Sequence, residues 1–122
     1  MLAPDPIELT RKLVASDTIN LIRSTEMGAG VAKALGPHSV VMLKNHGIVT
    51  AAPTIDEVVI RTIMFENAAQ IQMIMEAAGN TAPEFPAKDI EQLKHDISRP
   101  EQFVVNFNYL VRRAKRREKS AG

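Results

Sequence analysis

The side chain with the clearest potential for chemistry is His46, which lies in a polar break between two apolar runs. The segment from Ser39 to Thr50 reads Ser-Val-Val-Met-Leu-Lys-Asn-His-Gly-Ile-Val-Thr. Asparagine and glycine tolerate the positive φ of a tight corner, so this pattern predicts two strands joined by a turn that carries His46. A histidine on a rigid hairpin can face a pocket and bind a metal ion. The alternative is a turn histidine that faces water, which the spacing alone favours.

The bulk composition fits one globular domain or part of one, because 45% of the 122 residues are hydrophobic. The absence of cysteine excludes a thiolate metal site, a cysteine nucleophile and a disulfide framework, and it suits a cytoplasmic protein. The N-terminus lacks the charged and apolar regions of a signal peptide. No apolar run approaches the roughly 18 residues of a membrane span, so we expect no membrane partner.

A glycine- and alanine-rich helix is predicted before the hairpin. Ser24 or Thr25 can cap it, and Gly36-Pro37 ends it. Gly28 and Gly30 each cost such a helix about 1 kcal/mol relative to alanine, so we expect a sheet to pack closely against them. A phosphate-binding G-x-G-x-x-G loop is not formed, because a lysine occupies the third glycine position.

The segment after the hairpin predicts one long helix. A capping box at Thr54–Glu57 begins it, and it runs to about Ala78. Its apolar residues go nearly all the way round, so we expect burial on more than one side, against a sheet and a second subunit. We expect its methionines to fill a core. Glu66 and Asn67 interrupt the apolar surface, so the carboxylate must be exposed, paired or hydrogen-bonded. We expect a structural role for it, and the alternative is a hydrogen bond to the metal-site histidine.

The C-terminal third predicts a linker, a short helix and a final amphipathic helix. A second capping box at Ser98–Glu101 begins the last helix. The segment Arg112–Lys119 carries a charge of +5, so the rest of the chain sums to −4. A solvated helix end is the favoured interpretation, an anion-binding tail is the alternative, and charge alone does not predict nucleic-acid binding. For Tyr109 we expect a packing role. The apolar stripe of the last helix is Phe103, Phe107, Leu110, Val111 and Ala114.

Three features together resemble the class II aldolase/adducin family. One is the hairpin segment Leu43–Val49, and the second is the helix Met27–Gly36 before it. The third is the long helix, which Pro53–Glu57 opens and which carries Glu66–Ala69. The resemblance covers roughly Ile19 to Gly79.

This resemblance implies an α/β fold, a three-layer α/β/α arrangement around a largely antiparallel sheet, present here as a partial domain. It also implies an oligomer, usually a tetramer with active sites between subunits. Enzymes of this type bind a divalent metal, most often zinc, through three histidines, and a carboxylate moves the proton. They cleave, epimerise, dehydrate or decarboxylate small hydroxy-carbonyl substrates. The histidine of the Asn-His-Gly hairpin is the third metal ligand, which corresponds to His46.

The sequence departs from the family pattern in its other ligands, which form a His-x-His pair upstream of the hairpin, preceded by the acid/base glutamate. Only His38, His46 and His95 are present, and no His-x-His occurs. The expectation is therefore a fragment or truncated form of a metal-dependent lyase or epimerase, inactive alone, with no assignable catalytic residue. Its partner would be a second copy or a complementing N-terminal half. The alternative is a non-catalytic, adducin-like interaction domain. We expect residues 1–80 to be the C-terminal part of the family domain and residues 81–122 to be the linker and basic amphipathic helix.

Overall fold

The computed structural model describes residues 13–14, 21–43, 46–80 and 85–121. The segment from Asp5 to Ser16 carries signals both of a helix start and of a short strand at Ile7–Thr10, of which the strand is favoured. Residues 7–10 lie outside the described residues. The chain divides into two compact units, residues 1–51 and 52–122. This division follows packing within the chain, and the predicted family boundary at residue 80 stays a prediction.

The first unit contains the predicted glycine-rich helix, α2 (Thr25–Leu35). Ser24 caps it, because its hydroxyl accepts a hydrogen bond from the Met27 backbone N–H at 3.2 Å. Gly36 ends it with a φ of 52°, a conformation that glycine adopts without steric cost. The predicted cap and stop are both confirmed.

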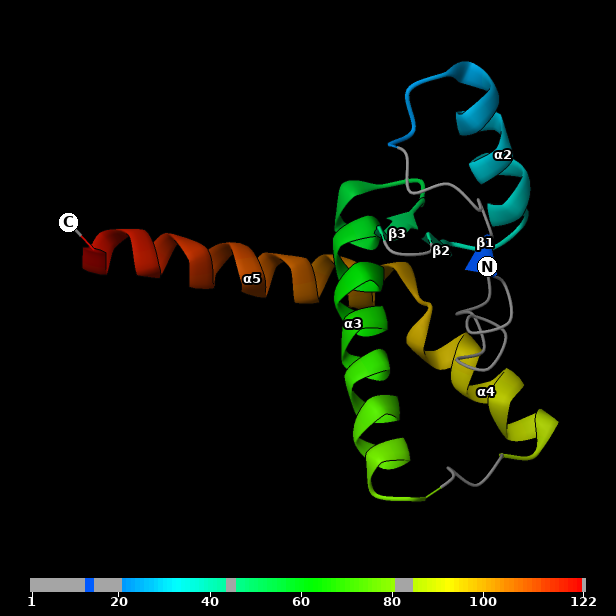
Figure 1. The fold of residues 1–122 in the computed structure, drawn as a ribbon. Coiled ribbons are helices and arrows are strands. Elements are labelled where there is room, and N and C mark those ends of the chain that lie inside the picture. The colour runs from blue at the N-terminus through cyan, green and yellow to red at the C-terminus, as the bar shows by residue number, and fades with distance from the viewer. Residues whose placement is uncertain (1–12, 15–20, 44–45, 81–84, 122) are drawn as a thin grey trace. The chain divides into compact units, whose positions relative to one another are not determined.

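Three strands form the sheet of the first unit, in the order β1 (Leu13–Val14), β2 (Val40–Leu43) and β3 (Gly47–Thr50). Strand β1 pairs with β2 in parallel, and β2 pairs with β3 as an antiparallel hairpin (Figure 1). Val40 and Val41 are buried in β2, next to the buried Ser39. The predicted hairpin is confirmed, and the described residues form an α/β fold.

The second unit is helical, and it consists of α3 (Ile55–Ala77), α4 (Ala87–Ile97) and α5 (Pro100–Ala121) (Figure 1). Thr54 begins α3 as predicted, since its hydroxyl accepts a hydrogen bond from the Glu57 N–H at 3.4 Å. Among the helices of the described residues, none combines the length and apolar character needed to cross a membrane.

The predicted capping box at the start of α5 is wrong. Ser98 instead closes α4, where its backbone N–H donates to the Lys94 carbonyl. Its hydroxyl is buried and has no hydrogen-bond partner. Pro100 is the first residue of α5, the position where a missing N–H costs nothing. The proline therefore sets the start of α5, and the serine does not cap it.

The core of the second unit lies where α3 crosses α5. Ile60 and Arg61 of α3 and Phe103 of α5 are the buried residues of these two helices. The Arg61 guanidinium lies over the Phe103 ring, 4.9 Å from its centroid. Its Nε donates to a Glu57 carboxylate oxygen at 2.8 Å. A buried cation is thus both paired and stacked, which meets the cost of removing it from water.

The described residues do not show the close packing that we expected at Gly28 and Gly30 or the burial that we expected along the whole of α3. A Cβ atom added at Gly28 or at Gly30 would meet nothing within 4 Å, so no close approach explains these glycines in the described residues. The second half of α3 is exposed rather than buried, with Ile71 59%, Met73 69% and Ile74 68% accessible. Met73 and the two isoleucines therefore fill no core in the described part of the chain.

Candidate functional site

His46 lies at the corner of the hairpin, immediately before β3, and it is exposed. Its backbone N–H donates to the Leu43 carbonyl at 3.0 Å, which closes the corner between β2 and β3. The register on either side is fixed by the pairing of Leu43 with Gly47 and of Met42 with Ile48. The backbone that carries the imidazole is therefore held by the sheet, although the side chain itself is accessible.

Gly47 explains why the corner has this sequence. Its φ is 124°, which L side chains rarely adopt, and nothing lies within 4 Å of a Cβ added there. Glycine is therefore required by backbone conformation and not by crowding.

The other two histidines lie elsewhere. His38 is half-buried between α2 and β2, and its N–H donates to the Leu35 carbonyl at 3.0 Å. His95 belongs to α4 in the second unit, where its Nδ1 lies 3.3 Å from an Asp96 carboxylate oxygen. His38 and His46 belong to the first unit and His95 to the second, and the described residues form no metal-binding group that contains any of the three.

A metal site needs several ligands that converge on one point. Among residues 13–14, 21–43, 46–80 and 85–121, no group of three or more His, Asp or Glu side chains could hold a metal ion. The donor set of the described residues therefore does not fit a complete divalent-metal centre. His46 as a metal ligand stays a prediction.

Glu66, the carboxylate that interrupts the apolar surface of α3, is exposed and accepts a hydrogen bond from Gln70 Nε2 at 3.4 Å. This is one of the arrangements that we expected for it. Arg61, in contrast, was not recognised from the sequence as a buried residue. The signal was present, because Glu57 and Arg61 are four residues apart in the order that favours an ion pair on one helix face.

Comparison with known proteins places the hairpin and its flanking helices in a family. The model of the class II aldolase and adducin N-terminal domain matches residues 6–73, which is more than half of the chain. The match includes α2, the hairpin with His46 and most of α3. No solved structure matches the chain significantly.

Characterised relatives show the same relationship. The chain is 29% identical over 73 residues to a 3,4-dihydroxyphthalate decarboxylase of Terrabacter sp. (strain DBF63), which covers 60% of this chain and 30% of that protein. It is 32% identical over 75 residues to decarboxylase NovR of Streptomyces niveus, covering 62% and 27%. It is 34% identical over 62 residues to the meiotically up-regulated gene 14 protein of Schizosaccharomyces pombe, covering 51% and 24%.

The aligned part of the chain thus spans less than a third of the length of these relatives. The family match rests on a contiguous segment, and the hairpin and the capped helix after it are both present in the structure. The chain belongs to the class II aldolase and adducin family.

Proposed function

We propose that this chain is part of a divalent-metal-dependent lyase that acts on a small hydroxy-carbonyl or hydroxy-acid compound. The observation that carries the proposal is His46, held at the corner of a paired hairpin inside the family match. Decarboxylases among the relatives favour carbon–carbon bond cleavage over epimerisation.

In this proposal His46 is one ligand of a site, most simply of a zinc site, that other residues complete. The described residues do not form that site by themselves. The remaining ligands and the acid/base carboxylate would come from another segment or another chain, and this polypeptide would be inactive alone. Completion of the family domain would also give the three-layer α/β/α arrangement.

The second half of α3 supports a completed assembly. Its exposed apolar residues are typical of a helix that another layer or subunit covers. We propose that the cover is either a second copy of the chain or a complementing N-terminal half. A non-catalytic, adducin-like interaction domain would use the same surface, and this surface is what keeps that alternative open.

The metal proposal can be tested by mixing the chain with a full-length relative and measuring bound zinc after gel filtration. We expect zinc in the mixed complex to fall when His46→Ala replaces the parent chain, because removal of one of three ligands leaves an incomplete site. His95→Ala is the matched control, since that histidine is exposed on α4. Metal content unaffected by His46→Ala in a complex that still forms would refute the proposal.

The same mixture separates the two functions. If the complex forms, holds zinc through His46 and releases carbon dioxide from a dihydroxyphthalate-type acid, the lyase proposal holds. If a stable oligomer forms that binds no metal, the interaction-domain alternative replaces it.

A further inference from the structure

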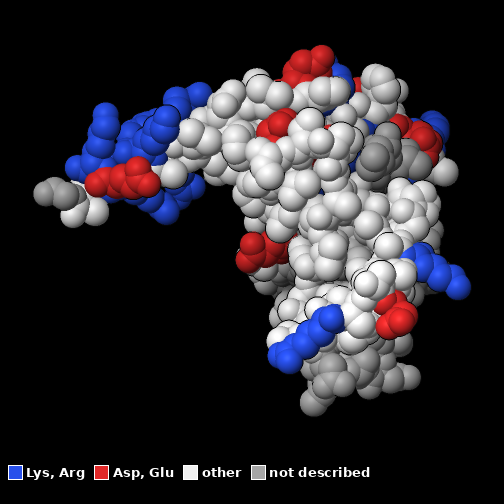
Figure 2. Space-filling view, turned by 90° about the horizontal axis from the view of Figure 1, so that it is seen from above, with Lys and Arg blue, Asp and Glu red and all other residues white. Residues whose placement is uncertain are grey.

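The C-terminal half of α5 presents a concentrated positive charge that the proposed lyase function does not use. Every residue from Arg112 to Ala121 is exposed, and Figure 2 shows the Lys and Arg side chains gathered around this end of the helix. None of the ion pairs among the described residues involves one of these cations. Glu118 is the single acid between them. We call this segment the basic end, and its cations are Arg112, Arg113, Lys115, Arg116, Arg117 and Lys119.

Helical geometry directs the centre of this charge away from the packed side of α5. Successive residues turn by about 100°, so Arg116, nine positions after Phe107, lies on the opposite side of the helix. Phe103 is buried and Phe107 is half-buried, so the side of α5 that carries these two rings is the side that packs. The basic end is therefore a free surface of the second unit and not part of its core.

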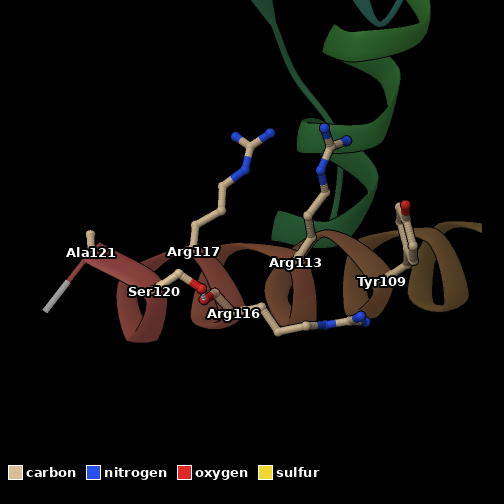
Figure 3. Close-up of a pocket in the computed structure, with 6 residues that line it drawn as sticks. All are labelled: Tyr109, Arg113, Arg116, Arg117, Ser120 and Ala121. Atoms are coloured by element: carbon tan, nitrogen blue, oxygen red, sulfur yellow. Dashed lines mark hydrogen bonds between the residues drawn. The ribbon is translucent and has the colours of Figure 1, made fainter.

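An aromatic ring lies on the same face as the charges. Tyr109 is 50% exposed and lies on an open surface of α5 together with Arg113, Arg116, Arg117 and Ser120. In Figure 3 the side chains of Arg113 and Arg117 project from the same side of the helix as the Tyr109 ring. The predicted packing role of Tyr109 is thus not seen in the second unit, where half of its surface is accessible.

These features fit a phosphodiester backbone with unpaired bases. Arginine forks bind phosphate oxygens in pairs, and four of the six cations are arginines. An accessible aromatic ring beside a basic surface is the arrangement on which proteins stack single-stranded bases. We propose that the basic end binds single-stranded nucleic acid, with Arg113, Arg116 and Arg117 on the phosphates and Tyr109 stacked on a base.

A membrane surface is the less favoured partner for a structural reason. Helices that lie in a bilayer interface place bulky apolar residues opposite their cations. In the basic end the residues that continue the apolar side are only Ala114 and Ala121. The bulky members of the stripe lie earlier in α5, where Phe103 is buried against α3.

The test measures binding of the full chain to a fluorescent oligouridylate by anisotropy over a series of salt concentrations. One variant combines Arg113→Ala, Arg116→Ala and Arg117→Ala. Its matched control, which removes the same charge from exposed positions elsewhere, combines Arg23→Ala, Lys33→Ala and Lys88→Ala. Alanine keeps the helix in both variants, and circular dichroism verifies this.

We expect the control to bind like the parent chain and the arginine variant to bind at least tenfold more weakly. Its slope of log affinity against log salt should fall by about 2, because each phosphate contact on a single strand contributes roughly 0.7. Tyr109→Ala should weaken binding about tenfold and Tyr109→Phe should not, since phenylalanine keeps the stacking surface.

Equal losses in the arginine variant and in the control would overturn the proposal, because net charge alone would then explain binding. So would a duplex that competes as well as the single strand, or vesicles of anionic phospholipid that remove the chain from the oligonucleotide. These outcomes do not depend on zinc or on a second polypeptide, so they leave the lyase proposal untouched.

Discussion

The two halves of α3 have similar apolar content but differ in burial, because the fully buried residues of the helix are confined to the first half. In the first half Ile60 and Arg61 are buried, and the Arg61 guanidinium lies over the Phe103 ring of α5. In the second half no residue is fully buried, and Ile71, Met73 and Ile74 are exposed. The helix is continuous through both halves, so backbone propensity does not account for the difference.

The difference shows that apolar periodicity predicts that a helix face will be covered without predicting what covers it. In the first half the cover lies in the described chain, where Phe103 of α5 stacks against the Arg61 guanidinium. In the second half any cover must come from other residues or another molecule. A large exposed apolar helix face in water is unfavourable, so this half is where association is expected.

The largest expected effect comes from breaking the covered half. Phe103→Ala should lower the free energy of unfolding by about 3 kcal/mol or more, because it leaves a cavity and removes the ring beneath the Arg61 guanidinium. Urea unfolding followed by circular dichroism measures this change. Val105→Ala, which truncates a 63% exposed residue of the same helix, should stay within about 0.5 kcal/mol. Equal losses in the two variants would show that α5 does not pack through Phe103.

A smaller effect on stability is expected in the uncovered half. Ile71→Gln combined with Ile74→Gln should change the unfolding free energy of the monomer by no more than about 0.5 kcal/mol, because both side chains are exposed. The same variant should abolish self-association measured by sedimentation velocity. Gln70→Asn, a polar change on the same turn, is the control. A loss of monomer stability comparable to that of Phe103→Ala would place this face inside the fold.

The smallest expected effect concerns Asp96 in the last turn of α4, which lines the same hollow as Ile60 and Phe103. Hydrogen bonds donated by the Gln92 amide, at 3.1 Å, and then by His95 hold the pKa of this carboxyl below its ordinary value of 3.8. The stabilisation is therefore fully present above pH 3.8 and is lost as the pH falls through the lowered pKa. The group is exposed, so the change in stability is small. Carbon-13 NMR of the Asp96 carboxyl should show a higher midpoint in Gln92→Ala, and an unchanged midpoint would exclude this hydrogen bond as the cause.

Local elements were predictable from the sequence because short-range chemistry determines them. Ser24 and Thr54 cap their helices, Gly36 ends α2, and the hairpin forms around Gly47 as the residue types predict. The false cap at Ser98 shows the limit of such patterns, because a proline two residues later sets the helix start. Burial was less predictable, since it depends on partners distant in sequence, as the Arg61–Phe103 contact shows.

The candidate site was predictable only in part. The position of His46 at the corner follows from its neighbours, and its proposed role as a ligand follows from the family. A metal centre is a convergence of distant residues, and no local pattern around His46 can supply the others. The face shared by Tyr109 and the arginines was encoded in their helical spacing. Whether that face is free to bind a partner depends on which side of α5 packs, and the sequence alone does not determine that side.

The strand order has a consequence for how a second polypeptide could meet His46. Among the described strands β3 pairs with β2 alone, and an edge strand of a sheet is a position where another strand can be added. Strand addition aligns residues by backbone hydrogen bonds, in a register that the pleat fixes. Because β3 begins directly after His46, such an added strand would run past the corner. A second polypeptide added beside β3 would then bring its own side chains close to the imidazole.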